Sequence, residues 1–320
     1  MQNSLSRINI GTVKNEYSMN ELANRFAMYL DISAISVKSY NSAIRKFLSF
    51  LHDKGITLPT RETIILYKKT LCEKYSANTT GLYLSALRRF FAWCDSEGLY
   101  PNITSGIKSP KITHEHKRDA FSAGELKTII ASIERKGIEG LRNYAMFTLI
   151  TTCGLRTCEV IRANVGDIHR VSGVLVLSIQ GKGHTSKDAF VKLTEPVEKA
   201  LREYLKARGH VSDNEPLFAS CSRRNKGKRL TTRTVSNVCK NAMRSAGYDS
   251  KRLTAHSLRH SAVTLALMAG MSLQEVQAFA RHTSMNTTLI YAHNVSRMKS
   301  LCELSVSSAI FGECKCITQN

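Results

Sequence analysis

The sequence Ala255-His256-Ser257-Leu258-Arg259-His260 opens an apolar helical pattern that extends to Ala269. It is followed by Ala280-Arg281-His282, at the end of another expected helix, and by Thr288-Leu289-Ile290-Tyr291. Arginine binds phosphate through paired hydrogen bonds, histidine transfers protons near neutral pH, and tyrosine can form a covalent intermediate. Each of these residues alone is commonly a packed core residue. Their combination favours transfer of a phosphoryl group onto a protein oxygen.

A further arginine lies upstream, in Gly154-Leu155-Arg156-Thr157-Cys158-Glu159. Arg156 directly follows the glycine that ends an apolar helix expected from Leu141 to Thr152, so the turn presents its side chain. Glu159 lies one helical turn further on, where its carboxylate can hold the guanidinium of Arg156. By itself the hexapeptide is more typical of a surface ion pair.

Two segments rich in β-branched residues, 174–180 and 189–193, predict a β-hairpin with the turn Gly181-Lys182-Gly183-His184. The glycines allow a sharp turn, so Lys182 can be projected as a mobile cation. A lysine at a hairpin tip is often only solubilising. The turn does not open a helix, so it is not a Walker loop, and ATP binding is not supported.

The charge balance points to a polyanionic partner. Lysine and arginine number 46 against 25 aspartates and glutamates, a formal net charge of +21 in 320 residues. Such an excess favours nucleic acid, through phosphate contacts and counterion release. Charge alone leaves a membrane surface or an acidic protein open.

The cysteines and the N-terminal residues indicate the cellular compartment in which the protein resides. The nine cysteines are scattered, without the paired C-x-x-C spacing of a zinc site. The N-terminus lacks the basic start and apolar core of a signal peptide, and no apolar stretch is long enough to span a bilayer. We therefore expect a reduced, soluble, cytoplasmic protein.

The first hundred residues predict a bundle of about four helices, opened by the capping box Ser18-Met19-Asn20-Glu21. A basic, proline- and glycine-punctuated linker follows, and a flexible basic loop is expected at 223–229. Basic residues outside the expected core stripes are the candidates for DNA contact: Lys38, Arg45, Lys46, Arg88, Arg89, Lys117, Arg118, Arg223, Arg224, Lys226, Lys228 and Arg229.

In order and spacing, the chemistry-bearing residues resemble the tyrosine recombinases (phage integrase family), over the chain from Ser18 to Lys299. The positions that carry the resemblance are Arg156, Lys182, His256 to His260, His282 and Tyr291. One departure is Arg281, where the family usually has glycine. The resemblance implies a mainly α-helical protein: an N-terminal helical bundle (a SAM-like core-binding domain) and a mostly helical catalytic domain with a small antiparallel β-sheet. An arm-binding domain is not expected.

The expected division is a lead at 1–17, a core-DNA-binding domain at 18–105, a basic linker at 106–118, a catalytic domain at 119–299 and a tail at 300–320. The resemblance implies that the tail packs into a neighbouring protomer. It also implies a homotetramer on synapsed double-stranded DNA with a specific recombination site, in the bacterial cytoplasm at the nucleoid.

The resemblance also implies the catalytic roles. Tyr291 attacks the scissile phosphate to form a 3′-phosphotyrosyl bond, and Lys182 protonates the leaving 5′-oxygen. Arg156 and Arg259 hold the non-bridging oxygens, and Glu159 orients Arg156. His256 takes the tyrosine proton and His282 bonds a phosphate oxygen. Because the phosphotyrosyl bond retains the energy of the ester, a 5′-hydroxyl can reseal the strand without ATP. No metal or cofactor is expected.

Several alternatives remain open. Integration or excision of a mobile element is the favoured role, and resolution of chromosome or plasmid dimers uses the same chemistry. A type IB topoisomerase shares that chemistry as well. A DNA-binding protein without catalysis has no need of all these residues. A zinc hydrolase using His256, His260 and His282 would want a glutamate where Ser257 stands.

Overall fold

The computed structural model describes residues 17–111, 120–181, 183–299 and 302–312. The chain divides into two compact units, Met1–Glu115 and His116–Asn320. No helix in the described ranges is both long and apolar enough to cross a membrane.

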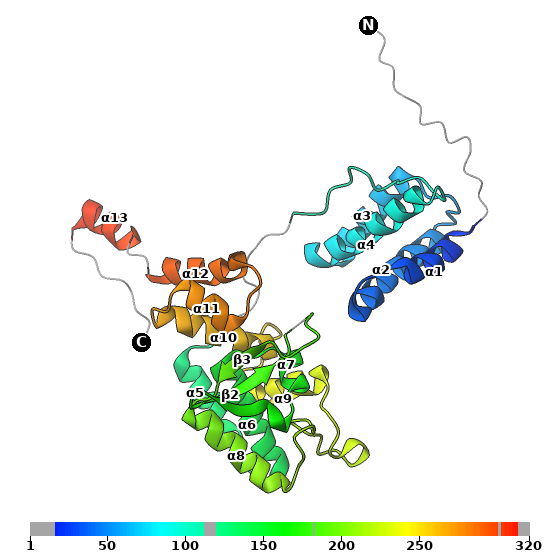
Figure 1. Ribbon diagram of the computed structural model, residues 1–320. Coiled ribbons are helices and arrows are strands. Elements are labelled where there is room, and N and C mark those ends of the chain that lie inside the picture. The colour runs from blue at the N-terminus through cyan, green and yellow to red at the C-terminus, as the bar shows by residue number, and fades with distance from the viewer. Residues whose placement is uncertain (1–16, 112–119, 182, 300–301, 313–320) are drawn as a thin grey trace. The chain divides into compact units, whose positions relative to one another are not determined.

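The first unit is a helical bundle (Figure 1, blue to cyan). Its helices are α1 (Met19–Tyr29), α2 (Ala34–Asp53), α3 (Arg61–Lys74) and α4 (Ala77–Ser96). The predicted capping box opens α1, with the backbone N–H of Ser18 donating to Glu21 Oε2 at 2.7 Å. Aromatic rings fill the interior: the Phe90 ring centroid lies 5.4 Å from that of Phe26 and 4.9 Å from that of Phe91. Such rings bury large apolar areas and hold the helices together.

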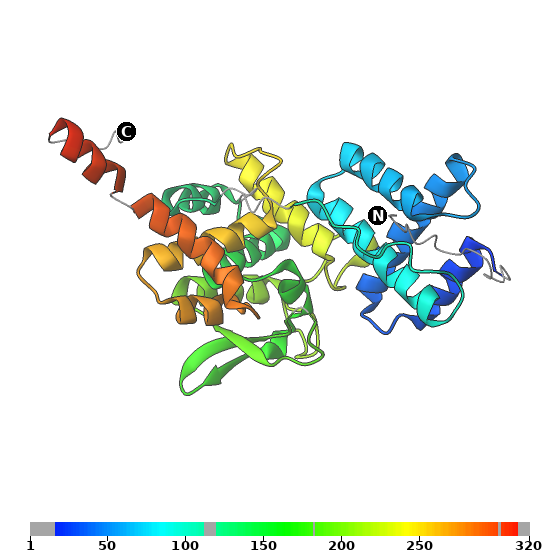
Figure 2. The same ribbon diagram turned by 90° about the horizontal axis from the view of Figure 1, so that it is seen from above.

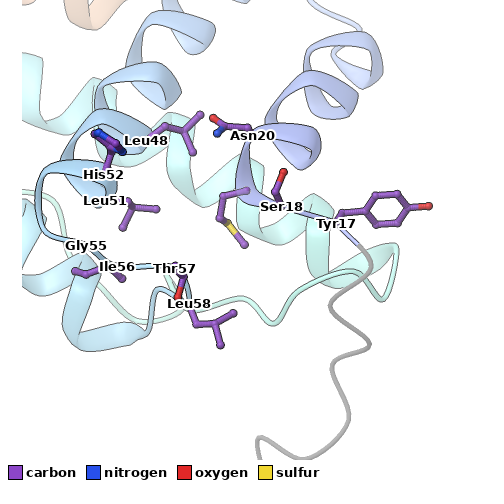
Figure 3. Close-up of a pocket in the computed structure, with 11 residues that line it drawn as sticks. Tyr17, Ser18, Asn20, Leu48, Leu51, His52, Gly55, Ile56, Thr57 and Leu58 are labelled. Carbon is purple, nitrogen blue, oxygen red and sulfur yellow. The ribbon is translucent and has the colours of Figure 1, made fainter.

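A cavity of about 640 Å³ opens in this unit, between the start of α1 and the turn after α2 (Figure 3). Leu48, Leu51 and Leu58 line it together with polar groups such as Ser18 and His52. None of the residues predicted to carry chemistry lines this cavity.

The second unit contains the remaining elements. They are α5 (Ala123–Ser132), α6 (Gly137–Cys153), α7 (Thr157–Arg162), η1 (Val165–Asp167), β1 (Ile168–Val171), β2 (Val174–Ile179), β3 (Ala189–Lys192), α8 (Glu195–Arg208), η2 (Arg223–Asn225), α9 (Thr232–Ser245), α10 (Ala255–Met268), α11 (Leu273–Ala280), α12 (Met285–Lys299) and α13 (Cys302–Phe311). Phe147, Leu149 and Ile150 of α6 are fully buried. Because α6 packs against both α8 and α10, it forms the centre of this unit (Figure 1).

The three strands form one antiparallel sheet in the order β1-β2-β3. The predicted hairpin is β2–β3, with Leu177 paired with Val191, and Figure 2 shows the sheet at one edge of this unit. Strand β1 has no signal in the sequence, because three of its four side chains are exposed and no apolar alternation marks it. The fold class predicted from the sequence, mainly helical with a small antiparallel sheet, is confirmed.

Helices α10, α11 and α12 contact one another and enclose a smaller apolar cluster that includes Val263, Leu267 and Val276. His256 and Arg259 lie on α10, His282 lies between α11 and α12, and Tyr291 lies on α12. The last helix, α13, has no buried residue, and both ribbon views show it away from the other helices of this unit (Figures 1 and 2).

Candidate active site

The turn between α6 and α7 places the first arginine. Gly154 ends α6 with φ 59°, a left-handed conformation that glycine adopts without strain. A Cβ at this position would lie 3.2 Å from the Phe279 ring of α11, so the close approach of the two segments also favours glycine. Arg156 then stands at the N-cap of α7, with 24% of its side chain exposed.

Glu159 is a fully buried carboxylate that accepts hydrogen bonds from two arginines. Arg156 donates through its backbone N–H at 2.8 Å and through Nη1 at 2.8 Å. Arg281 donates through Nη2 at 2.9 Å. Burial by itself raises the pKa of Glu159, but the charge of Arg281 and the hydrogen bonds from both arginines outweigh it and lower the pKa. Glu159 is therefore an anion at neutral pH.

Arg259 is buried on α10 and bridges two turns of the chain. Its Nη1 donates to the carbonyl of Gly154 at 2.5 Å, and its Nη2 donates to the carbonyl of Ala280 at the end of α11. Burial and the neighbouring Arg156 and Arg281 lower its pKa to about 9. That value is still well above neutral pH, so the guanidinium remains charged.

The two histidines of α10 differ in environment. His256 is exposed in the first turn of the helix, whereas His260 is buried and its Nδ1 lies 3.2 Å from Thr264 Oγ1. His256 is also among the charges that lower the pKa of His282. The charge of the exposed His256 imidazole therefore acts on the same buried ring as the charges of the arginines.

His282 follows α11 and is buried. Its Nδ1 lies 3.0 Å from the hydroxyl of Thr288 on α12. Burial, followed by the charges of Arg259, Arg156, Arg281 and His256, lowers the pKa of His282 to about 4. The ring is neutral at physiological pH, so if Thr288 donates to Nδ1, the Nε2–H can donate to an anionic oxygen.

Tyr291 lies on α12 and is 7% exposed. Its ring packs edge-on against His260, with centroids 4.6 Å apart, and is stacked with His282 at 5.9 Å. Apolar side chains of α10 and α11 complete its surroundings. Tyr291 is also one of the groups whose charge affects the pKa of Arg259. The phenol therefore lies beside the imidazoles and within the field of the arginine cluster.

A cavity of about 380 Å³ lies against this cluster and is lined by Arg156, Arg281 and His282. Gly181 and His184 of the β2–β3 turn also line it. The His184 Nδ1 lies 2.5 Å from Asp188 Oδ2, which ties the two arms of that turn together. Lys182, the predicted general acid, lies outside the described residues. A phosphate-sized group in this cavity would meet donors from α7, α11 and the turn.

The basic residues predicted to contact DNA fall into three groups. Lys117 and Arg118 lie outside the described residues. Some side chains are exposed in the first unit or in the loop of the second: Lys38, Arg45, Arg89, Arg223, Arg224, Lys226 and Lys228. Three others make contacts within the protein: Lys46, Arg88 and Arg229.

The contacts of this third group are structural. Lys46 Nζ donates to the Tyr75 hydroxyl at 3.0 Å, and Arg88 Nη2 donates to the carbonyl of Ile107 at 2.8 Å. Arg229 Nη1 donates to the carbonyl of Ile161 at 2.6 Å, which fastens the basic loop beside the end of α7. The backbone N–H of Ser220 donates to the carbonyl of Lys228 at 2.8 Å, and the N–H of Gly227 donates to the carbonyl of Ser220 at 2.9 Å, so the loop that contains the short helix η2 is closed on itself.

Two functional contacts could not be read from the sequence. In the sequence, Thr288 is marked only as part of the tyrosine motif. In the structure, its hydroxyl lies 3.0 Å from Nδ1 of His282. Arg281 stands out as a departure from the family pattern, but no local signal shows that its side chain reaches Glu159. The described residues contain no group of three histidine, cysteine, aspartate or glutamate side chains able to hold a metal ion, so the zinc-hydrolase alternative finds no support in them.

Comparison with known proteins identifies the class. Residues 120–298 match the phage integrase family, and residues 23–98 match the phage integrase N-terminal SAM-like domain. The chain belongs to the phage integrase family. The predicted enzyme class, a site-specific tyrosine recombinase that transfers DNA strands, is confirmed.

Particular relatives share most of the chain's length. The tyrosine recombinase XerC of Herpetosiphon aurantiacus is 27% identical over 288 residues, covering 86% of this chain and 91% of that protein. XerA of Pyrococcus furiosus is 28% identical over 275 residues, covering 85% and 89%. The fold is similar to XerH bound to its difH substrate (TM-score 0.71, 22% identity, 91% and 84% covered). It is also similar to a lambda integrase tetramer on a Holliday junction (TM-score 0.68, 18% identity, 87% and 78% covered).

Proposed function

We propose that Tyr291 is the nucleophile of this recombinase. Its hydroxyl oxygen attacks the scissile phosphorus, a Tyr291–phosphorus bond forms, and the bond to the 5′-oxygen breaks. The phenol proton passes to His256, and Lys182 supplies a proton to the leaving 5′-oxygen. A 5′-hydroxyl from a second strand reverses the step and reseals the DNA, so no external energy source is required. The observation that carries this proposal is the packing of the Tyr291 ring between two imidazoles beside Arg259.

The arginines and His282 stabilise the charge of the transition state. Arg156, partly exposed beside the cavity, holds a non-bridging oxygen while Glu159 fixes its orientation. Arg259 supplies a second cation, and neutral His282 donates a hydrogen bond to an oxygen. Cations and donors fixed in place before the reaction stabilise developing charge strongly, because the site need not reorganise.

We propose double-stranded DNA with a specific recombination site as the substrate, cut by a homotetramer on two synapsed duplexes. The bound states of the XerH and lambda integrase structures support this. Residues 18–105 bind the core DNA, 106–118 connect the units and 119–299 catalyse. The exposed apolar side chains of α13, Val306, Ile310 and Phe311, support docking of the tail on a second copy of the chain.

For the biological role we propose integration or excision of a mobile element, in the bacterial cytoplasm at the nucleoid. Resolution of chromosome or plasmid dimers is the second candidate, favoured by the likeness to XerC and XerA. The two roles differ in the sites used: element ends recombine with a different target, whereas dimer resolution joins two copies of one site. Sequencing the junctions made in cells separates them.

Covalent trapping tests the proposal. We expect the protein to form an adduct with members of a randomised library of nicked duplexes, from which the cleaved strand end diffuses away. Peptide mapping should place the adduct on Tyr291. Tyr291→Phe should bind the selected duplexes and form no adduct, because it keeps the ring and lacks the attacking oxygen. An adduct that persists in Tyr291→Phe would assign the nucleophile elsewhere.

A further inference from the structure

Arg281 occupies a backbone conformation that disfavours a side chain. It follows α11 with φ 54° and ψ 47°, in the left-handed region. Glycine enters this region freely, whereas a Cβ approaches the following carbonyl. In the described part of the chain, Ser172 in the β1–β2 turn (φ 49°) is the other non-glycine residue with positive φ. The Arg281 side chain must therefore make contacts that compensate for the strain.

Those contacts involve all three nitrogens of the guanidinium, and the side chain is 11% exposed. Nη2 donates to Glu159 Oε2 at 2.9 Å and to the carbonyl of Gly154 at 3.0 Å. Nη1 donates to the carbonyl of Phe279 at 2.6 Å, and Nε lies 3.5 Å from Glu159 Oε1. The side chain thus fastens the end of α11 to the α6–α7 turn.

Residue 281 also holds Arg156 by two routes. Its backbone carbonyl accepts a hydrogen bond from Arg156 Nη2 at 3.1 Å. Its side chain binds the carboxylate that accepts Arg156 Nη1 at 2.8 Å. Arg156, Glu159 and Arg281 therefore form a closed ring of hydrogen bonds. A glycine at position 281 would keep the first route and lose the second.

The charges of this ring and of the neighbouring Arg259 sum to a positive surplus. Glu159 carries one negative charge, and Arg156, Arg259 and Arg281 each carry a positive one. Arg281 shares the carboxylate with Arg156, so Glu159 does not neutralise Arg156 alone. The surplus positive charge faces the cavity that Arg156, Arg281 and His282 line. An anionic phosphate there would balance it.

We infer that Arg281 is a positioning residue for DNA cleavage, which fixes Glu159 and through it directs the guanidinium of Arg156 at the scissile phosphate. The inference rests on the proposed function, since it assigns Arg156 to that phosphate. Arg281 acts through Arg156 and need not touch the DNA.

The first test measures the single-turnover rate of adduct formation on nicked duplexes selected from the randomised library. Arg281→Gly removes the guanidinium and relieves the backbone, so the protein should fold while the rate falls about ten- to a hundredfold, as for a displaced catalytic group. Arg281→Lys keeps the charge and should recover part of the rate. Ser172→Gly relieves the same backbone strain outside the site and should cleave at the wild-type rate. A wild-type rate in Arg281→Gly overturns the inference.

Two further measurements separate positioning from general structural support. In a Glu159→Gln background, Arg281→Gly should have little additional effect, because contacting residues that act as a unit are not additive. On a duplex with a methylphosphonate at the scissile position, one anionic oxygen becomes a methyl group and the need for Arg156 falls. The defect of Arg281→Gly should then shrink. Equal defects on both duplexes, or full additivity with Glu159→Gln, overturn the role.

The same experiments distinguish this inference from the proposed function. If the wild-type protein forms no adduct with any duplex of the library, the proposed function fails, and the positioning role fails with it. If the wild-type protein forms the adduct at Tyr291 and Arg281→Gly matches its rate, only the role of Arg281 is refuted.

Discussion

Two groups of basic residues in this protein differ in their burial and in how strongly solvent and salt screen their charges. Arg259 and Arg281 are nearly removed from water, and backbone carbonyls and a carboxylate hold their donors. Arg223, Arg224, Lys226 and Lys228 are exposed on a closed loop. The buried cations have fixed directions and act in a medium that screens them weakly, whereas salt screens the exposed ones. We therefore expect the first region to control the rate of strand cleavage and the second to control DNA affinity.

Removing a buried cation gives the largest expected effect. Arg259→Ala leaves the carbonyls of Gly154 and Ala280 without their donor and removes a charge from the proposed transition state. Adduct formation should fall by about a hundred- to a thousandfold, the usual cost of losing one such donor. Arg259→Lys should recover little, because an ammonium cannot span both carbonyls. Single-turnover trapping measures the rate.

The exposed Arg89 supplies the matched control for Arg259→Ala. Arg89→Ala should leave the cleavage rate at saturating DNA unchanged. Cleavage by Arg259→Ala at a rate close to that of Arg89→Ala would show that burial does not mark the catalytic cations, and the contrast between the two regions would fail.

The sequence predicts the buried region better than the exposed one. The one-turn spacing of Arg156 and Glu159 is local, and the structure joins the two by an ion pair. Arg281 reaches the same carboxylate across 122 residues, so its contact depends on how the end of α11 lies against the α6–α7 turn and α7. Strand β1 could not be predicted because its side chains are mostly exposed. The helices with apolar stripes could be predicted, because their apolar residues recur at the helical period along the sequence.

For the basic residues nearer the surface, the sequence does not predict which side chains make contacts within the protein. Arg88 and Arg89 are adjacent in sequence, yet Arg88 bonds the carbonyl of Ile107 and the hydroxyl of Ser109, whereas Arg89 is exposed. Lys46 similarly donates to Tyr75. A basic residue off the apolar stripe has the same pattern whether it faces DNA or fastens a neighbouring turn. Only the positions of distant acceptors distinguish the two, and a single sequence does not contain them.

Neutralising the exposed loop should change affinity and leave chemistry intact. With Arg223, Arg224, Lys226 and Lys228 all changed to Gln, DNA affinity should fall. The slope of log affinity against log salt should flatten by up to about 0.9 for each phosphate that the loop no longer neutralises. The cleavage rate at saturating DNA should stay near that of the wild type. Titrations at several salt concentrations measure the slope.

Arg229 sharpens this test, because it lies in the same loop but donates to the carbonyls of Ile161 and Ala163. Arg229→Gln should lower thermal stability, while the four-residue variant should not. If the four-residue variant keeps the wild-type salt slope, the loop does not contact phosphates.

The smallest expected effect is a pH dependence of stability that the buried cations impose on His282. Burial and the charges of Arg259, Arg156 and Arg281 lower the pKa of His282 from 6.5 to about 4. The unfolded chain therefore binds a proton at higher pH than the folded chain. The stability linked to His282 is complete above pH 6.5, falls as pH decreases toward 4, and totals at most about 3 kcal/mol. Thermal unfolding across this window should show a shallower decline of stability in His282→Gln than in the wild type. His210→Gln, which alters an exposed ring, should follow the wild type.

Arg281→Gly should also weaken the dependence of stability on pH, because it removes one of the charges that keep the His282 imidazole neutral. An identical decline in the wild type and His282→Gln would mean that the buried cations do not set the charge of this histidine.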